Sequence, residues 1–479
     1  MNGLRKYINQ KPALKRVLKV AFKLFCNPIL NLVIAPLSRV VVRVLASFVR
    51  FADGKSWMPI FYFFLPSIHT EGVQRLHILH KVQIETGRRV IVISPWWFWP
   101  ASTAKDPFFV SFIYGLTPGI RYVWIPKWLQ HSVHYVVTSL LSCAGRYDAW
   151  LKPKAIHSAI RYHDFSTIDH TDLLNCGSRV DLHIPKSHEH VLEKNLSQLG
   201  VSAHDWFVCV HAREHGWHKE IAKTEYSPNY SFKQEDHRNV DIRDYFPAID
   251  YIRSKGGMVV RIGDPSMKRV RGIDGFVDYP LTKFWSLPMD LFIISRCRFF
   301  LGCCSGANLF PASFGKPALL VNYPPPIHTI KFPYSSTLFL LKHMIEIKNG
   351  RMLSLREMFE GMHCVINDPI KFESIGLKWE SNLPEDILEA TKEMLNLIEN
   401  DAFDQKRTKE QELSHQLRLQ AIDYLCANLS GTGALRFSNG RSSQSRISST
   451  FATRYFADEE PLVMGVLDDP ERVTQKSIL

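Results

Sequence analysis

A histidine and two arginines follow two apolar runs that predict buried strands. His211 and Arg213 end the segment WFVCVHAR, and Arg261 ends the segment MVVR. The planar guanidinium group of arginine can bind phosphate oxygens through two parallel hydrogen bonds, and two arginines can neutralise a diphosphate. The segment CCSGAN places Ser305 and Gly306 where a third strand passes into a helix, so a hydroxyl and backbone N–H groups can bind the same anion. These residue types indicate a diphosphate-binding site.

Strands and helices alternate from residue 205 onward, and this order decides where those side chains lie. The sequence predicts strands over 206–213, 258–265, 298–306 and 316–326, separated by helices over 241–257, 288–297 and 307–315. Such alternation is typical of a doubly wound parallel sheet, whose ligands bind outside the carboxyl ends of the strands. One crevice should therefore contain His211, Arg213, Arg261, Asp264, Ser305 and Gly306.

The part of the chain before residue 200 predicts a second α/β unit. Two β-rich runs, 88–95 and 119–126, each end in proline, and a helix fits between them. We therefore expect an α/β protein with two Rossmann-like domains and a basic amphipathic helical segment at the amino terminus. The predicted divisions are membrane-surface helices over 1–55, an acceptor domain over 56–200, a nucleotide-sugar domain over 201–380, and helices with a mobile tail over 381–479. The Gly-, Ser- and Arg-rich stretch 431–450 is expected to be a mobile loop.

Charge and hydropathy at the amino terminus indicate an anionic surface as a partner. The chain has 59 Lys and Arg against 46 Asp and Glu, a formal charge of +13. Lys15, Lys19 and Lys23 recur at helical spacing beside an apolar face, which is typical of a helix lying in an anionic membrane interface. The longest charge-free run, 24–38, is shorter than the roughly 20 residues that a spanning helix needs and contains two prolines. Two ordinary core helices with solvated lysines are the alternative.

The polar segment 214–240 has no periodic pattern and predicts a flap over the crevice. Its Arg238 and Asn239 join the predicted ligand-binding residues. His211, His215 and His218 have the spacing of one helix face, as a zinc site would require. Gly216 and the preceding strand argue against a helix there, so no metal site is predicted.

The order VCVHAR, HRNVDIRDYFPAIDYIRSKGGMVVRIGDP and MDLFIISRCRFFLGCCSGANLFPASFGKPALLVNY resembles a family of bacterial glycosyltransferases among the surface-carbohydrate biosynthesis proteins. The resemblance covers about 205–326 and reaches more loosely back to Arg88 and forward to RISSTFATRYF. It implies a two-domain GT-B glycosyltransferase without a metal-binding Asp-x-Asp site, with the donor on the carboxyl-terminal domain and the acceptor on the other. In fucosyltransferase-like relatives, a strand-end His-x-Arg supplies the arginine that binds the donor diphosphate. By position that role would pass to Arg213.

A metal-independent transfer must neutralise the departing diphosphate with arginines, hydroxyls and backbone N–H groups. Arg213, Arg261 and Ser305 can do so, and an inverting transfer also needs a general base, for which Glu214 and His211 are nearest. Either of these two could instead orient Arg213. The remaining predicted substrate-binding residues are Arg238, Asn239, Asp264, Asp290, Gly306 and Asn308.

The sequence therefore predicts a cytoplasmic enzyme, peripheral on the inner face of the cell membrane. It would transfer a sugar from a nucleotide-sugar donor to a surface-glycan or lipid-linked acceptor. No cofactor, metal or nucleic acid is predicted. Two alternatives remain: another nucleotide-dependent group transferase of polysaccharide biosynthesis, moving for example a pyruvyl or phosphosugar group, and a non-enzymatic membrane-associated protein that binds anions.

Overall fold

The structure, a computed structural model, describes most of the chain from residue 60 to residue 457. The described ranges are 60–64, 69–95, 107–125, 160–163, 178–216, 236–324, 326–366, 368–428 and 441–457. The predicted amphipathic segment over 1–55, the tryptophan-rich stretch 96–100 and the flap residues 217–235 lie outside these ranges.

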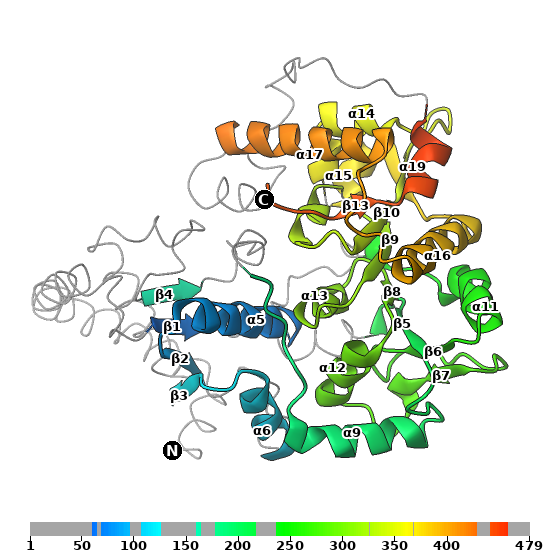
Figure 1. The fold of residues 1–479 in the computed structure, drawn as a ribbon. Coiled ribbons are helices and arrows are strands. Elements are labelled where there is room, and N and C mark those ends of the chain that lie inside the picture. Colours follow the sequence, from blue (N-terminus) through cyan, green and yellow to red (C-terminus); the bar gives the residue numbers. More distant parts are fainter. Residues whose placement is uncertain are drawn as a thin grey trace, which may run out of the picture.

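The amino-terminal unit is a four-stranded parallel sheet with strand order β3-β2-β1-β4. Its elements are β1 (Ile60–Phe64), α5 (His69–Thr86), β2 (Val90–Pro95), α6 (Pro107–Leu116), β3 (Arg121–Ile125) and β4 (Ile160–His163). Figure 1 shows α5 running beside this sheet toward the larger unit. The two strands and the helix predicted in this region are confirmed.

The carboxyl-terminal unit is a seven-stranded parallel sheet with strand order β13-β10-β9-β8-β5-β6-β7. Its strands are β5 (Phe207–His211), β6 (Met258–Arg261), β7 (Phe276–Asp278), β8 (Phe300–Gly302), β9 (Ala318–Tyr323), β10 (Thr337–Leu341) and β13 (Arg446–Ile447). Numbered along the chain, the four strands of the amino-terminal sheet have the order 3-2-1-4, and the first six strands of this sheet have the order 3-2-1-4-5-6. This is the order expected of a Rossmann-like sheet. The prediction of two Rossmann-like units is confirmed.

Helices cover the large sheet, and local sequence signals fix their ends. α12 begins after Ser286, whose hydroxyl accepts a hydrogen bond from the Met289 N–H at 3.3 Å. α11 ends before Gly256, whose φ of +81° lets the chain turn into β6. The longer helices are α9 (Lys186–Gln198), α11 (Phe246–Ser254), α12 (Leu287–Arg296), α16 (Pro384–Glu399), α17 (Lys409–Asn428) and α19 (Ser449–Phe456).

Shorter elements complete the unit. They are the 3-10 helices η7 (Ile242–Tyr245), η8 (Tyr279–Leu281), η9 (Gly306–Leu309), η10 (Pro326–Lys331) and η11 (His363–Val365), the helices α13 (Phe310–Ser313), α14 (Leu355–Glu360) and α15 (Pro369–Ser374), and the antiparallel pair β11 (His343–Glu346) and β12 (Leu377–Glu380).

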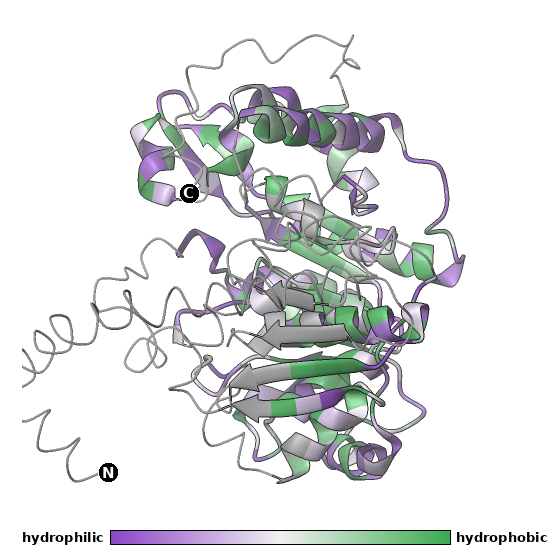
Figure 2. Cartoon of the chain, turned by 90° about the vertical axis from the view of Figure 1, so that its left-hand side faces the viewer, coloured by the Kyte–Doolittle hydropathy of each residue, from purple (hydrophilic) through white to green (hydrophobic). Residues whose placement is uncertain are grey.

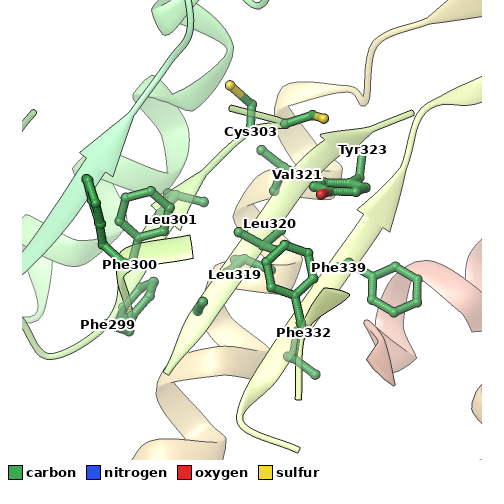
Figure 3. Packing of buried hydrophobic residues seen from close by; sticks show 14 of the residues in the cluster. Phe299, Phe300, Leu301, Cys303, Leu319, Leu320, Val321, Tyr323, Phe332 and Phe339 are labelled. Carbon is green, nitrogen blue, oxygen red and sulfur yellow. The ribbon is translucent and has the colours of Figure 1, made fainter. Parts of the chain in front are cut away.

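The core explains why the strand-end polar residues are exceptional. Every residue of β5, β8, β9 and β10 is buried. Figure 3 shows Phe299, Leu319 and Phe339 filling the space around the sheet, with Cys303 and Tyr323 at one end of it. In Figure 2 the coloured strands are largely hydrophobic, and hydrophilic residues gather on the helices. A buried polar group at the end of such a strand needs a hydrogen-bond partner, which can be another protein group, water or a ligand.

The two units meet beside the carboxyl ends of the large sheet. α5 contacts η9 and α13, the two elements that directly follow β8 (Figure 1). A backbone hydrogen bond of 2.7 Å from the Leu182 N–H to the Ser313 carbonyl ties the linking segment to α13. The end of β8 therefore lies close to the amino-terminal unit.

The expected mobile loop over 431–450 is wrong for its described part. Arg446 and Ile447 form β13, which pairs with β10 and extends the sheet beyond the predicted boundary at residue 380. The Ser443 and Ser445 hydroxyls are buried and accept or donate hydrogen bonds with each other and with Thr329 and Phe332 carbonyls. Small polar residues are typical of loops, but here they satisfy buried carbonyl groups.

No helix among the described residues combines the length and the apolar character needed to cross a bilayer.

Candidate functional site

The strand order reverses between β5 and β8, and this is where an open parallel sheet binds its ligand. Residues after β5 and residues after β8 face each other across this switch point. The Arg213 N–H donates a hydrogen bond to the Cys303 sulfur at 3.2 Å. The strand-end segments that the sequence singled out are therefore directly adjacent.

Arg213, Arg238 and Asn239 come together although 24 residues separate the first two. The Val240 N–H donates to the Arg213 carbonyl at 3.2 Å, which closes the base of the polar segment. The Arg213 guanidinium donates to the Asn239 side-chain oxygen at 2.5 Å, and Arg238 Nε donates to the Cys304 carbonyl at 3.1 Å. Two guanidinium groups thus lie at the switch point.

Ser305 contributes a hydroxyl that has no hydrogen-bond partner among the described residues. Its side chain is 8% exposed, and its Oγ forms no hydrogen bond although the residue stands directly before η9. The hydroxyl therefore does not act as a helix N-cap. Gly306 begins η9, and Asn308 within η9 is buried. Of these residues, Ser305 is the one whose side-chain polar atom is buried without a hydrogen-bond partner among the described residues.

Arg261 and Glu214 bind each other. The Arg261 guanidinium is wholly buried and donates to Glu214 at 2.6 Å, to Asp278 at 3.3 Å and to the Lys268 carbonyl at 2.7 Å. Glu214 also accepts from the Lys268 N–H at 3.0 Å. Both were expected at the reacting groups, one on the diphosphate and one as base. These two assignments stay predictions; the contacts themselves form a clamp that joins the ends of β5, β6 and β7.

His211 is the other candidate base and is held as a neutral imidazole. Burial lowers its pKa from 6.5 to about 4, and the cations of Arg261 and Arg213 act in the same direction. Its Nδ1 lies 3.1 Å from the Ile262 carbonyl. A carbonyl can only accept, so Nδ1 carries the proton and Nε2 keeps its lone pair.

Two acidic residues border the crevice on the β6 side. Asp264, after β6, accepts hydrogen bonds from the N–H and the hydroxyl of Ser266. Asp290, in the first turn of α12, has one carboxyl oxygen that is buried without a hydrogen-bond partner, and burial raises its pKa well above the ordinary range.

Two residues that the sequence reasoning missed lie at the same edge of the sheet. Lys342 directly follows β10 and is buried; its ammonium lies 3.3 Å from the Ser381 hydroxyl and within electrostatic reach of Cys303 and Cys304. Burial lowers its pKa. Trp285 precedes α12 and donates its indole N–H to the Gly263 carbonyl at 2.7 Å. Neither residue belongs to a sequence motif, so their position at this edge of the sheet becomes apparent only in the folded structure.

The arrangement suits an anion. Three cations and an unpartnered hydroxyl lie around the end of β8, where charge-assisted hydrogen bonds are strongest because water is largely excluded. Among the described residues, no group of three or more His, Cys, Asp or Glu side chains could hold a metal ion. The histidine triplet considered for zinc includes His218, which lies outside the described ranges.

The chain shows a distant similarity to several solved structures. A glycosyl transferase family 9 protein from Veillonella parvula is 12% identical, with a TM-score of 0.41, over 71% of this chain and 97% of its own. The ADP-heptose LPS heptosyltransferase II of E. coli is 11% identical, with a TM-score of 0.33, over 59% of this chain and 90% of its own. The E. coli heptosyltransferase WaaC, solved with ADP, is 10% identical, with a TM-score of 0.29, over 59% of this chain and 91% of its own. No family model and no curated protein matches the sequence. At such low similarity, the function of this chain has to be argued from its own site.

Proposed function

We propose that this protein is a glycosyltransferase that takes a sugar from a nucleotide-sugar donor and passes it to a surface-glycan or lipid-linked acceptor. The observation that carries the proposal lies at the switch point of the parallel sheet: the Arg213 N–H bonds the Cys303 sulfur, and the Ser305 hydroxyl two residues further on has no hydrogen-bond partner among the described residues. The sequence resemblance to bacterial surface-carbohydrate glycosyltransferases supports the same class.

Arg213 and Ser305 would bind the donor diphosphate and stabilise the negative charge that it gains as the sugar leaves. Arg238, anchored to the Cys304 carbonyl, adds a second cation at the same strand end. Such preorganised donors can replace a divalent cation, because they are already oriented in a site from which water is largely excluded. The proposed transfer is therefore independent of metal.

His211 is the stronger of the two candidates for the general base. Glu214 is engaged by Arg261 and by a backbone N–H, whereas the Nε2 lone pair of His211 is kept available by the bond of Nδ1 to the Ile262 carbonyl. In this proposal His211 accepts the acceptor hydroxyl proton, and Glu214 positions the loop that carries Arg213. The acceptor would approach from the amino-terminal unit, since α5 lies against the segment after β8.

Calorimetric titration with ADP, GDP and UDP tests the donor site directly. The full chain should bind at least one of these nucleotides saturably, and Arg213→Lys should weaken that binding by about tenfold or more, because lysine cannot reproduce the bidentate fork. Arg243→Lys is the matched control, since Arg243 is 76% exposed and its guanidinium pairs with Asp241.

Nucleotide release from a panel of sugar nucleotides, supplied with and without EDTA, tests the reaction. We expect slow hydrolysis of one donor in the absence of acceptor, unaffected by the chelator. A chain that binds none of the nucleotides, or one in which Arg213→Lys and Arg243→Lys bind nucleotide equally well, would overturn the proposal.

A further inference from the structure

Trp285 is an exposed tryptophan that is nevertheless fixed in orientation. Its side chain is 39% exposed, and its indole N–H donates to the Gly263 carbonyl at 2.7 Å. A single hydrogen bond of this kind satisfies the only polar group of the ring, so the exposed part is purely aromatic.

The sequence around Trp285 offers no packing partner of the usual kind. A hydrophobic residue directly before a helix N-cap commonly packs against the fourth residue of the helix. Here the N-cap is Ser286 and the fourth helical residue is Asp290, whose carboxyl group cannot form that apolar contact. An apolar contact at the start of α12 therefore does not account for the position of the Trp285 ring.

Its anchor places Trp285 beside the carboxyl end of β6. Gly263 follows β6 directly after Ile262, the residue whose carbonyl binds the His211 ring. A Cβ added to Gly263 would lie 3.7 Å from His211 Nδ1, so the carbonyl segment that holds the indole lies against the end of β5. Trp285 is thus bonded to the β6 side of β5, whereas Arg213 is bonded to the β8 side.

The spacing between these two sides suits a nucleotide. Strands β8, β5 and β6 are neighbours in this order, and neighbouring strands lie about 4.8 Å apart, so two spacings amount to roughly 10 Å. A ligand whose diphosphate lies at Arg213 and Ser305 would cross the end of β5 and bring its nucleoside to the β6 side. Asp264 stands there, and an acidic residue at the end of the second strand of such a sheet can accept hydrogen bonds from ribose hydroxyls.

We propose that Trp285 is the platform on which the nucleobase of the donor stacks. The inference rests on the proposed donor site and adds to it the position of the nucleoside and the residue that holds the base. Stacking on an aromatic ring is open to every base, because each base has a π face. Trp285 would therefore supply affinity for the nucleoside, and the polar groups near it would supply the choice of base.

Calorimetry on the full chain with two probes separates this role from that of the diphosphate-binding residues. The probes are the nucleoside diphosphate that binds most tightly and inorganic pyrophosphate. Trp285→Leu should weaken binding of the nucleotide by about 5- to 150-fold, the range measured for loss of one base–aromatic stack. It should leave binding of pyrophosphate unchanged, and Trp285→Phe should keep most of the nucleotide affinity. Ile370→Ala, which removes an apolar side chain that is 63% exposed on α15, is the control for loss of surface apolar area.

The outcomes distinguish this inference from the function on which it rests. If the wild-type chain binds no nucleotide, the proposed function fails. If it binds nucleotide and Arg213→Lys weakens binding while Trp285→Leu does not, the function stands and the stacking role is wrong. Equal losses for nucleotide and pyrophosphate in Trp285→Leu would also reject stacking, because they would show that the tryptophan only supports the fold of the crevice.

Discussion

Replacing Arg261 by methionine should destabilise the carboxyl-terminal unit strongly and affect nucleotide binding only through the fold. Arg261 is wholly buried, and its guanidinium joins Glu214, Asp278 and the Lys268 carbonyl at 2.6, 3.3 and 2.7 Å. Methionine keeps much of the side-chain volume but removes the charge. Glu214 and Asp278, whose side chains are 18% and 13% exposed, would then lose their shared cation in a poorly solvated place.

The expected cost is about 3–5 kcal/mol of the free energy of unfolding, the usual result of removing one partner from a buried ion pair. That exceeds the ~1 kcal/mol or less of an exposed pair. For a unit of this size it corresponds to a fall in melting temperature on the order of 10 °C. Arg253→Met is the control, since Arg253 pairs with the largely exposed Asp250 at 3.2 Å.

Urea unfolding followed by tryptophan fluorescence measures the change, and a double-mutant cycle with Glu214→Gln assigns it. The two substitutions together should cost clearly less than the sum of the single costs, because each removes the same contact. The clamp interpretation would be refuted by a variant that unfolds within 1 kcal/mol of wild type yet binds nucleotide more than tenfold less tightly. Arg261 would then be a donor ligand, as its position in the sequence suggested.

Three further predictions concern other groups. The pKa of His211 is lowered from 6.5 to about 4, so as the pH falls through this window the unfolded chain takes up a proton that the folded chain excludes. The free energy of unfolding should therefore fall as the pH falls. His211→Gln should remove up to ~3 kcal/mol of this pH dependence, measured by urea titrations at pH 7 and pH 4.5. Ser305→Ala should leave stability unchanged or raise it by up to ~1 kcal/mol, because it removes a buried hydroxyl without a partner, while nucleotide affinity measured by calorimetry falls; a loss of stability without a loss of affinity would mean that the hydroxyl has a structural role. Replacing Lys15, Lys19 and Lys23 by Glu should release the protein from anionic liposomes in a sedimentation assay, at roughly 1 kcal/mol per lysine, and equal pelleting of wild type with neutral liposomes would contradict the electrostatic reading.

The alternation of apolar runs was sufficient to predict two of the four strands of the amino-terminal sheet and four of the seven strands of the large sheet. Strands such as β5 and β9 are buried on both faces, so each forms a short continuous apolar run that stands out between polar segments. Such a run was absent for β13, which consists of Arg446 and Ile447 in a stretch rich in Ser and Arg. Its place in the sheet depends on pairing with β10, more than 100 residues earlier, and on buried serine hydroxyls. Local composition therefore predicted a loop where tertiary contacts make a strand.

In the candidate site, too, strand order predicts which side chains lie at one edge of the sheet, whereas their hydrogen-bond partners are known only from the tertiary structure. Strand order is enough to place Arg213 and Arg261 at one edge of the sheet, and at the level of sequence the two arginines are equivalent. The structure adds the partners: Arg261 meets carboxylates 47 and 17 residues away, and the contacts of Arg213 include the Asn239 side chain and the Cys303 sulfur. An arginine whose charge is already balanced by carboxylates gains little from a phosphate, because the phosphate would have to displace them.

Trp285 and Lys342 extend this reasoning to residues without any motif. Each lies next to a helix or strand end that became part of the crevice only when the sheet formed, through the carbonyl of Gly263 in one case and the end of β10 in the other. An exposed aromatic ring on one side of β5 and a cluster of cations with a free hydroxyl on the other are complementary to the two ends of one kind of molecule, a nucleoside joined to a diphosphate. In the proposed site, the diphosphate-binding residues could be predicted from the sequence. The direction of the ligand, from the β8 side of β5 to its β6 side, follows from the fold.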